Sequence, residues 1–388
     1  MKGHIRQRSN RSWAVVIDLG RDASGKRHQK WHTIHGTKKD AQRELTRLLH
    51  QLDTGTYVHP SKMTVAEYLE RWLKDYAQPN VAAKTFERYA EIARKHLIPH
   101  LGHFSLAKLH PLHIQEYYSY ALEQGRRDNK GGLSPQTVLH HHRLLRGALH
   151  QAVRWQLVVR NAADAVQPPR PRHKEVRALD DGETAKLLET AKSTRLHMPV
   201  LLALTTGLRR GEILALRWAD LDLDAGSLAV RRSLQQTAGG LSFKEPKSAH
   251  SRRVVALPAI TIDALKRHRS AQAQEKLRAG ASYTDGDLVY PMEDGRPWQP
   301  SSLTHSFVAL VRKVGISGFR FHDLRHSHAT QLLRQGVHPK IVSERLGHST
   351  VGLTLDVYSH VLPSMQAEAA ALMDRALRSA ISKAQASQ

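Results

Sequence analysis

The chain is organised around residues 319–362, FRFHDLRHSHATQLLRQGVHPKIVSERLGHSTVGLTLDVYSHVL. His322 and Arg325 are three residues apart, so a helix would place both side chains on one face. A guanidinium and an imidazole on one face suit a phosphate oxygen and a proton that must move. His348 follows, and Tyr358 comes a short helix later with a phenol that can act as a nucleophile. This stretch therefore predicts helices that carry a site for phosphate chemistry.

Two upstream segments add cations that such a site can use. In TTGLRRGE, residues 205–212, a loop is expected to enter a helix, and Glu212 one turn on can fix the guanidinium of a preceding arginine near a phosphate. In KEPKSAHSRR, residues 244–253, a basic turn is expected between two strands, where a lysine can reach a ligand held by other elements. Each segment taken alone is also compatible with an ordinary solvated surface.

Length and charge limit the class of protein. The chain has 388 residues, which is too long for one ordinary core, so two or three domains are expected. Hydrophobic residues make up 40% and charged residues 24%, which is a globular composition. Lysine and arginine number 59 against 35 acidic residues, giving a formal net charge of +24. Such a surplus indicates a polyanionic partner, and nucleic acid is the leading candidate because phosphate contacts supply most non-specific affinity.

Cysteine content and hydropathy exclude several other classes. The chain contains no cysteine, and therefore no disulfide framework, thiol nucleophile or cysteine-type zinc site. The N-terminal sequence MKGHIRQRSNRSW has no apolar run of the kind found in a signal peptide. No segment approaches the roughly 20 apolar residues that span a bilayer. We therefore expect no membrane partner and a cytoplasmic protein, associated with the nucleoid in a bacterium.

Residues 1–58 are predicted to form a small separate α/β module. Apolar residues alternate over 13–19, and 29–34 is a second strand candidate beyond the turn RDASGKR. A helical pattern opened by TKKD follows. The module holds twelve lysines and arginines against five acids, and Lys26 and Arg27 in the turn are candidate DNA contacts. A basic sheet of this kind can lie in a DNA groove, although a plain capping subdomain would show a similar pattern.

Residues 64–167 are predicted to form an all-helical domain. Thr64 and Glu67 fit a capping box at its first helix, and Pro99 is expected to end the second helix. The last long helix is expected from 136 to 157. Its polar face is expected to present four basic side chains: His141, Arg143, Arg146 and Arg154. This face can lie along a DNA duplex, or it can be a solvated surface.

Residues 175–364 are predicted to form one mixed α/β domain beyond the basic linker PPRPRHK. Helices are expected over 180–192 and 198–205, and strands over 228–258. Alternation in 227–233 and in 252–257, with a Gly-Gly turn between them, suggests a hairpin-like sheet. The pattern then becomes helical again. The tail, 365–388, is an alanine-rich amphipathic helix with an apolar stripe.

Taken together and in this order, the motifs resemble the tyrosine recombinase (phage integrase) family. They are TGLRRGE, a Pro-Lys turn between strands, HDLRH, LGHS and a tyrosine just before Ser-His, and they cover 176–362, about half the chain. The two upstream modules look like that family's arm-type DNA-binding domain and helical core-binding domain. The resemblance implies a multidomain, mainly α fold with small β-sheets, in which a tyrosine-recombinase catalytic domain follows these two modules.

Carried over to the matching positions, the resemblance implies a binding site for a scissile DNA phosphate. Arg209 and Arg325 would clamp the non-bridging oxygens of this phosphate. His322 and His348 would hydrogen-bond the same phosphate and help to move protons. Glu212 matches the acidic position that supports the site. This arrangement agrees with elementary chemistry, because two guanidinium groups can stabilise the negative charge that develops on these oxygens.

The resemblance also assigns the groups that break the bond. Tyr358 would be the nucleophile, giving a 3′-phosphotyrosyl enzyme and a free 5′-hydroxyl. Lys247 would be the general acid that protonates the leaving 5′ oxygen. The phosphotyrosine keeps the energy of the broken bond, so a second strand can reseal without ATP. The motifs also contain no acidic cluster of the two-metal type, and we expect no metal and no cofactor.

Three alternative assignments of single residues remain. His322 and His326 are four residues apart and can be interpreted as a metal pair, but no third ligand of suitable type and spacing follows. Tyr290 is a second phenol, but its setting in LVYP is typical of a core residue. Arg210 competes with Arg209, which is preferred because the family motif places its arginine directly after TGL.

Two other functions share some of these features. A type IB topoisomerase uses the same phosphotyrosine chemistry, and a DNA-binding architectural protein would keep the charge but lack a working site. The N-terminal module and the LGH motif favour a recombinase, and the intact set of site residues argues against decay. The family suggests double-stranded DNA attachment sites as the substrate and a homotetramer on DNA, with 365–388 packing on a neighbouring subunit. An excision factor and a host DNA-bending protein are further expected partners of such an integrase of a phage or integrative element.

Overall fold

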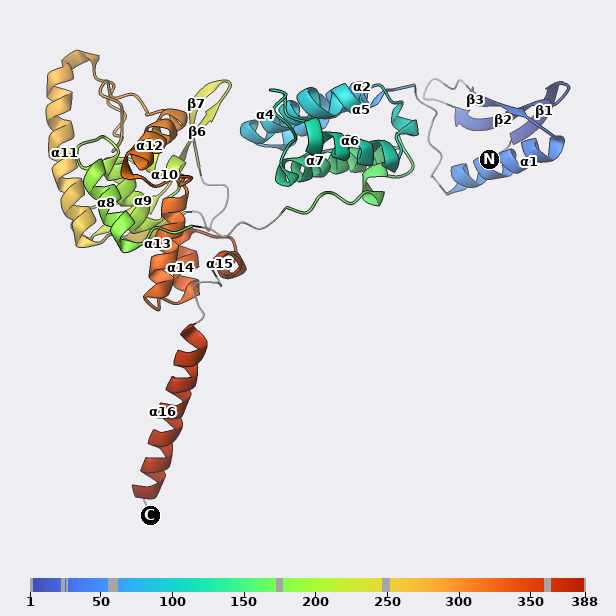
Figure 1. The fold of residues 1–388 in the computed structure, drawn as a ribbon. Helices are drawn as coiled ribbons and strands as arrows, with labels where there is room; N and C mark the ends of the chain where they lie inside the picture. Colours follow the sequence, from blue (N-terminus) through green and yellow to red (C-terminus); the bar gives the residue numbers. More distant parts are fainter. Residues whose placement is uncertain are drawn as a thin grey trace. The chain divides into compact units, whose positions relative to one another are not determined.

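The computed structural model describes residues 3–21, 25, 27–54, 62–171, 177–245, 252–358 and 364–386. The chain divides into two compact units, Met1–His173 and Lys174–Gln388. Both consist mainly of helices with small antiparallel sheets (Figure 1), which confirms the predicted fold class. The predicted domain borders remain predictions. Among the residues described, no helix is long and apolar enough to cross a membrane.

The N-terminal part of the first unit is a three-stranded antiparallel sheet followed by one helix. Its elements are β1 (Gly3–Ser9), β2 (Ser12–Arg21), β3 (Arg27–His35) and α1 (Lys38–Asp53). Thr37 and Asp40 form the capping box that starts α1, as the TKKD pattern predicts. The core packs the sheet on the helix through Val15, Ile17, Ala41, Leu45 and Leu48. The prediction missed β1 because Ile5 is its one large apolar residue, so the strand shows no alternating pattern.

The second part of this unit is all helical, as predicted. Its longer helices are α2 (Val65–Trp72), α4 (Ala83–Ile92), α6 (Pro111–Gln124) and α7 (Pro135–Arg154). Shorter helical turns join them: η1 (Leu73–Ala77), α3 (Gln78–Asn80), η2 (Ala93–Leu97), α5 (Ile98–Leu101), η3 (Leu106–Lys108) and η4 (Ala162–Ala165). Thr64 and Glu67 form the predicted capping box at the start of α2. Side chains from all four long helices make one core around Tyr68, Ile114 and Leu145.

The prediction that Pro99 ends the second helix is wrong. Pro99 lies in the first turn of α5 (Ile98–Leu101), which continues the same helical run. A proline lacks an N–H group and its ring clashes with the carbonyl four residues earlier. The turn before it, Ala93–Leu97, is π-helical, and this wider turn changes the spacing so that the helix continues past the proline. The same arrangement occurs at Pro79, which follows the π-helical turn Leu73–Ala77.

The prediction that α7 presents His141 on its exposed face is also wrong. His141 is only 1% exposed, because it is three and four residues from buried aliphatic residues of the same helix. Its Nδ1 lies 2.7 Å from the hydroxyl of Tyr117 on α6. His142 is buried as well and forms a matching pair with Tyr118 at 2.8 Å. These two histidines therefore join α6 to α7 and do not belong to a DNA-facing surface.

The second unit is the mixed α/β domain. Its longer helices are α8 (Asp181–Ala191), α9 (His197–Thr206), α10 (Arg210–Leu214), α11 (Ala259–Ala279), α12 (Pro300–Val314), α13 (Asp323–Arg334), α14 (Pro339–Leu346), α15 (Val351–Tyr358) and α16 (Ser364–Ala386). Its strands are β4 (Leu221–Asp222), β5 (Ser227–Val230), β6 (Ser233–Thr237), β7 (Gly240–Lys244) and β8 (Arg253–Ala256). Two 3-10 turns complete it: η5 (Trp218–Asp220) and η7 (Gly280–Ser282). The core of this unit includes Leu202, Phe307 and Leu324, which come from α9, α12 and α13.

The strands of this unit form two separate sheets, and not the single hairpin-like sheet predicted for 228–258. Strands β6 and β7 make a hairpin at the Gly-Gly turn, as expected. Strand β5 pairs with β4 on one side and with β8 on the other, so the order is β4-β5-β8. The predicted segments 227–233 and 252–257 do pair, as β5 with β8, but the prediction missed that the Gly-Gly turn between them belongs to a separate hairpin.

The tail forms α16, which confirms the predicted helix (Figure 1). Leu372, Met373 and Leu377 of the predicted apolar stripe are each more than half exposed. Its packing on another subunit remains a prediction.

Candidate active site

Helix α9 delivers the first arginine to the site through a glycine turn. Gly207 ends this helix with φ +68°, a left-handed conformation that favours glycine. A Cβ at this position would lie 2.6 Å from Leu346 Cδ2 and 2.7 Å from His328 Cδ2, so a larger residue would also clash. The chain then turns directly into Arg209, which is the N-cap residue of α10. The TGLRRGE motif therefore places an arginine at a fixed point between two helices.

Glu212 holds this arginine from one turn further along α10. Arg209 donates from Nη1 to Glu212 Oε1 at 2.8 Å and from its backbone N–H to Oε2 at 2.9 Å. Burial alone would raise the pKa of Glu212, but Arg253 and Arg209 together hold this pKa below its ordinary value. The carboxylate therefore stays charged, and the predicted contact between Glu212 and Arg209 is present. Arg210 points elsewhere, since it donates to the hydroxyl of Thr304 on α12.

The second arginine, Arg325, comes from helix α13 and is only 3% exposed. It donates from Nη1 to the carbonyl oxygen of Gly207 at 2.7 Å and from Nη2 to that of Leu346 at 2.8 Å. Arg209 donates from Nη2 to the next carbonyl oxygen, that of Gly347, at 3.2 Å. Two arginines from distant parts of the sequence thus meet at two adjacent carbonyl groups.

The two histidines of the prediction lie at the same place. His322 precedes the first residue of α13, and His348 follows Gly347, the glycine that ends α14 with φ +67°. Burial, and then the charge of Arg325, lowers the pKa of His322, with Asp323 opposing this effect. Burial, followed by Arg325 and other nearby cations, lowers the pKa of His348 to about 4. Both imidazoles are therefore neutral at pH 7, before a ligand is considered.

A hydroxyl group beside Nδ1 orients the imidazole ring of His348. His348 Nδ1 lies 2.8 Å from Thr354 Oγ1, and Thr354 on α15 is fully buried. If Thr354 donates this bond, Nε2 of His348 carries the proton and can donate to a phosphate oxygen. His348 is thus held by Thr354, on the helix that ends at Tyr358.

The structure brings five predicted site residues together: Arg209, Glu212, His322, Arg325 and His348. Two others cannot be placed. Lys247 lies outside the described residues, in 246–251. Tyr358 is the last residue of α15, and its side chain is likewise not among those described.

The candidate DNA contacts outside the catalytic domain have mixed settings. Arg143 and Arg154 are exposed on α7, whereas Arg146 donates from Nε to Asp164 at 2.7 Å. Arg27 pairs with Asp18 at 2.7 Å in the N-terminal sheet, and Lys26 is not among the described residues. Two of the three arginines predicted on the exposed face of α7, Arg143 and Arg154, therefore form no ion pair among the residues described.

Sequence reasoning missed two arginines behind the site, of which one has a largely buried side chain and the other is half-buried. Arg253 on β8 contacts Glu212, and Arg345 at the end of α14 donates from Nε to His328 Nε2 at 3.2 Å. Arg345 also donates from Nη2 to the carbonyl oxygen of Thr205 at 2.9 Å. His328 in turn contacts the carbonyl oxygen of Leu204 through Nδ1 at 2.7 Å. The basic turn that contains Arg253 was visible in the sequence, but such turns are usually solvated.

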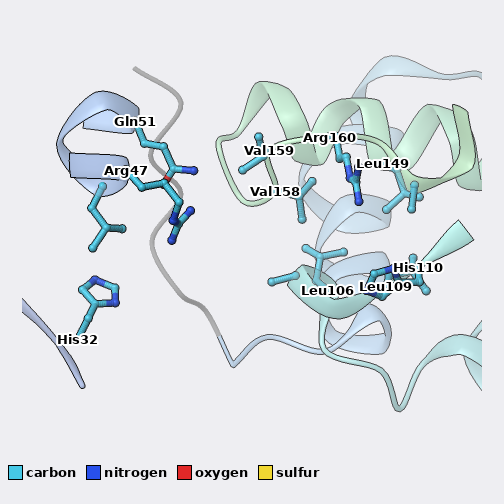
Figure 2. Close-up of a pocket in the computed structure, with 13 residues that line it drawn as sticks. His32, Arg47, Gln51, Leu106, Leu109, His110, Leu149, Val158, Val159 and Arg160 are labelled. Atoms are coloured by element: carbon cyan, nitrogen blue, oxygen red, sulfur yellow. The ribbon is translucent and has the colours of Figure 1, made fainter. Parts of the chain in front are cut away.

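No other described region competes as a site of reaction. The rings of His322 and His326 lie 5.0 Å apart, but no group of three metal-binding side chains occurs among the described residues. Tyr290 is buried in the core of its unit, and burial raises the pKa of its phenol. Figure 2 shows a pocket, one wall of which comes from the helical part of the first unit and contains Leu106, Leu109 and Val158. This largely aliphatic wall offers no nucleophile.

Sequence comparison places most of the chain among known proteins. The model of the phage integrase family matches residues 177–365, and that of the N-terminal SAM-like domain of phage integrases matches residues 64–122. A tyrosine recombinase XerC-like protein of Caldanaerobacter subterraneus is 30% identical over 377 residues, which cover 92% of this chain and 94% of the relative. An integrase of Saccharopolyspora erythraea is 26% identical over 413 residues, which cover 92% of each chain.

Solved structures of integrases are also similar to this chain in fold. The Tn1549 transposon integrase in complex with transposon right end DNA has a TM-score of 0.68 and 23% identity, and the match covers 80% of this chain and 100% of that one. A lambda integrase tetramer bound to a Holliday junction has a TM-score of 0.56 and 18% identity, covering 90% and 94%. At these identities the similarity establishes the shared fold.

Proposed function

This chain belongs to the phage integrase family of tyrosine recombinases and is a site-specific DNA recombinase of a phage or other mobile element; we propose that it acts through a covalent bond between Tyr358 and a DNA phosphate. The observation that carries the proposal is the meeting of Arg209 and Arg325. They donate to the adjacent carbonyl oxygens of Gly347 and Leu346, directly before His348. Guanidinium groups fixed in this way are prepared to receive a phosphate.

The two arginines would stabilise the charge that develops during attack. When an oxygen attacks a phosphodiester, negative charge spreads over the non-bridging oxygens. Arg209, oriented by Glu212, and Arg325, oriented by two backbone carbonyls, would bind these oxygens. His322 and His348 are neutral near pH 7 and would donate or accept hydrogen bonds to the same phosphate. Because this charge stabilisation comes from protein groups, we propose that the reaction needs neither metal nor ATP.

Bond breaking and resealing would balance as two transesterifications. The phenol of Tyr358 passes its proton to a neutral imidazole of the site as its oxygen attacks phosphorus. The bond to the 5′ oxygen breaks, and Lys247 supplies the proton that this oxygen takes up. The products are a 3′-phosphotyrosyl enzyme and a free 5′-hydroxyl. The 5′-hydroxyl of the partner strand then gives its proton to Lys247 and attacks the phosphotyrosine, and Tyr358 leaves and takes its proton back from the imidazole. No bond energy is lost in either step, which allows strand exchange without an external energy source.

DNA attachment sites are the proposed substrate, and several parts of the chain would contact them. Related integrases have been solved on transposon-end DNA and as a tetramer on a Holliday junction. We infer that this chain also assembles as a homotetramer on two double-stranded sites at the bacterial nucleoid, with residues 365–388 packing on a neighbour. Residues 1–58 and the exposed arginines Arg143 and Arg154 would hold the flanking DNA. An excision factor and a host DNA-bending protein are proposed as further partners.

Trapping of the covalent complex tests the chemistry directly. Wild type, Tyr358→Phe and Tyr290→Phe are mixed in EDTA with nicked duplexes from the element's boundaries, or from a randomised pool, and run on a denaturing gel. We expect a shifted protein–DNA band for wild type and for Tyr290→Phe, because the hydroxyl of Tyr290 is buried and has no hydrogen-bond partner among the described residues. Tyr358→Phe should bind DNA and give no covalent band. A covalent band in Tyr358→Phe, or none in a wild type that binds DNA tightly, would overturn the proposal.

A further inference from the structure

Arg253 is a buried cation that the proposed chemistry does not use. It is the first residue of β8, and its side chain is only 7% exposed. Its neighbour Arg252 has a side chain that is 62% exposed and pairs with Glu245. Burying a guanidinium is costly unless it is paired and fully hydrogen-bonded. Its position therefore needs an explanation beyond surface charge.

Arg253 shares one carboxylate with the first arginine of the phosphate site. It donates from Nη2 to Glu212 Oε2 at 2.9 Å, and Nη1 lies 3.4 Å from Oε1. Arg209 donates to the same two oxygens, at 2.9 Å from its backbone N–H and 2.8 Å from Nη1. Glu212 is thus held from both sides. If Arg253 were removed, only the two contacts from Arg209 would remain of these four. The carboxylate could then move together with the side chain of Arg209.

Arg253 also contacts the turn that carries the other half of the site. Its Nε donates to the carbonyl oxygen of Arg345 at 2.7 Å, at the end of α14. Its guanidinium lies against Gly347, where a Cβ would come within 3.0 Å of Nη1 and 3.3 Å of Cζ. Gly347 in turn accepts the bond from Arg209 and precedes His348. One side chain therefore connects the segment that holds Arg209 with the segment that holds His348.

We propose that Arg253 is a positioning residue for strand cleavage: it fixes Glu212 and the 345–347 turn together, and so sets the guanidinium of Arg209 where the scissile phosphate binds. This inference rests on the proposed role of Arg209 in binding that phosphate. Arg253 itself does not touch the phosphate. It acts on Arg209 through Glu212 and through the backbone of the 345–347 turn.

A substrate without the phosphate charge separates this role from a purely structural one. A methylphosphonate at the scissile position replaces one charged oxygen by a methyl group, so the arginine clamp has less charge to stabilise. For each enzyme, the cleavage rate on phosphate is divided by the rate on methylphosphonate. This ratio does not depend on the fraction of enzyme that is folded. Partial unfolding of a variant therefore cannot imitate the expected result.

The variants are Arg253→Lys and Arg253→Met, with Arg209→Ala as the reference and Arg252→Met as the matched control. We expect the rate ratio to fall in both Arg253 variants by roughly 10- to 100-fold, the range typical of outer partners that orient a site. The loss should be smaller for Arg253→Lys, which keeps the charge beside Glu212. Arg252→Met should leave the ratio unchanged, because that side chain is exposed and its ion pair among the described residues is with Glu245.

Two outcomes would overturn the inference in different ways. If Arg209→Ala lowers the ratio but the Arg253 variants slow both substrates equally, Arg253 is structural and the clamp survives. If Arg209→Ala leaves the ratio unchanged, the proposed clamp fails, and the role of Arg253 fails with it.

Discussion

Histidines lie beside other polar groups in two regions of the molecule, and they are fully buried only in the first of these two regions. Between α6 and α7 of the helical module, His141 and His142 each contact a tyrosine hydroxyl of the facing helix, at 2.7 Å and 2.8 Å. In the catalytic domain, His322 and His348 lie with Arg209 and Arg325 around the ends of α9 and α14. The two regions use the same residue type, but with different partners.

The partners distinguish a structural histidine from one that can act on a ligand. Burial is the largest cause of the low pKa in both regions, bringing His141 to about 3 and His348 to about 4. Around His348 the next largest cause is Arg325, a guanidinium fixed by backbone carbonyls. At His141 the ring instead completes a helix–helix hydrogen bond. A low pKa therefore does not identify the active site; converging cations from distant segments do.

The largest expected effect is that of Arg325→Lys. Arg325 spans the carbonyl oxygens of Gly207 and Leu346 with two nitrogens, and a single ammonium group cannot make both contacts and also serve a phosphate. We expect single-turnover cleavage of a nicked duplex to fall roughly 100- to 1000-fold, as when one preorganised donor is removed from a reaction site. DNA affinity, measured by gel shift, should change little.

The control for this prediction is Arg334→Lys, an exposed position at the other end of α13. It should cleave at the wild-type rate. If Arg325→Lys keeps cleavage within a few-fold of wild type, then Arg325 has a structural role, as His141 does. In that case the two regions would not differ in function.

Short motifs and their resemblance to a known family were enough to predict which residues meet around the proposed phosphate site. Arg209 and His348 lie just beyond glycines that end helices, and a glycine after a periodic segment is a recognisable helix stop. His322 and Arg325 stand three residues apart in a helical pattern. In each case the local sequence determines the local geometry, and the resemblance to the family supplied the expectation that these distant segments meet.

The sequence could not show which of several similar neighbours turns inward. Arg252 and Arg253 are adjacent and chemically identical, yet only Arg253 is buried. Its partners Glu212 and Arg345 are 41 and 92 residues away, so no local pattern marks it. His141 presents the same problem, because three consecutive histidines must occupy different faces of α7 and the sequence does not say which face meets α6.

A medium effect is expected in the helical module from His141→Gln. The pKa of His141 is about 3 in the folded chain and about 6.5 in an unfolded one, so the unfolded chain binds the proton first as pH falls. The free energy of unfolding should therefore decrease from pH 6.5 downward, by about 2 kcal/mol at pH 5. Glutamine does not titrate, so the variant should lose this pH dependence.

Hydrogen exchange of the α7 amides at pH 7 and pH 5 measures this change. At pH 7 the variant should be less stable by about 1–2 kcal/mol if its amide bonds Tyr117 poorly. The matched control is His150→Gln, a half-exposed position on the same helix, which should keep the wild-type pH dependence of exchange. If His141→Gln keeps the wild-type pH dependence, then the titration of His141 is not its cause. Cleavage of DNA at pH 7 should be unaffected in both histidine variants.

The smallest expected effect is that of Thr354→Val, which removes one hydroxyl beside one imidazole. Its Oγ1 lies 2.8 Å from His348 Nδ1, and valine keeps the shape of the side chain. Losing a single neutral hydrogen bond worth about 1 kcal/mol should lower the cleavage rate about fivefold, and Thr354→Ser should keep most of the rate. Tyr117→Phe makes the same deletion beside His141 and should lower stability without changing the rate. If Thr354→Val instead lowers stability and leaves single-turnover cleavage intact, His348 is held like His141, and the distinction between the two regions must rest on the arginines alone.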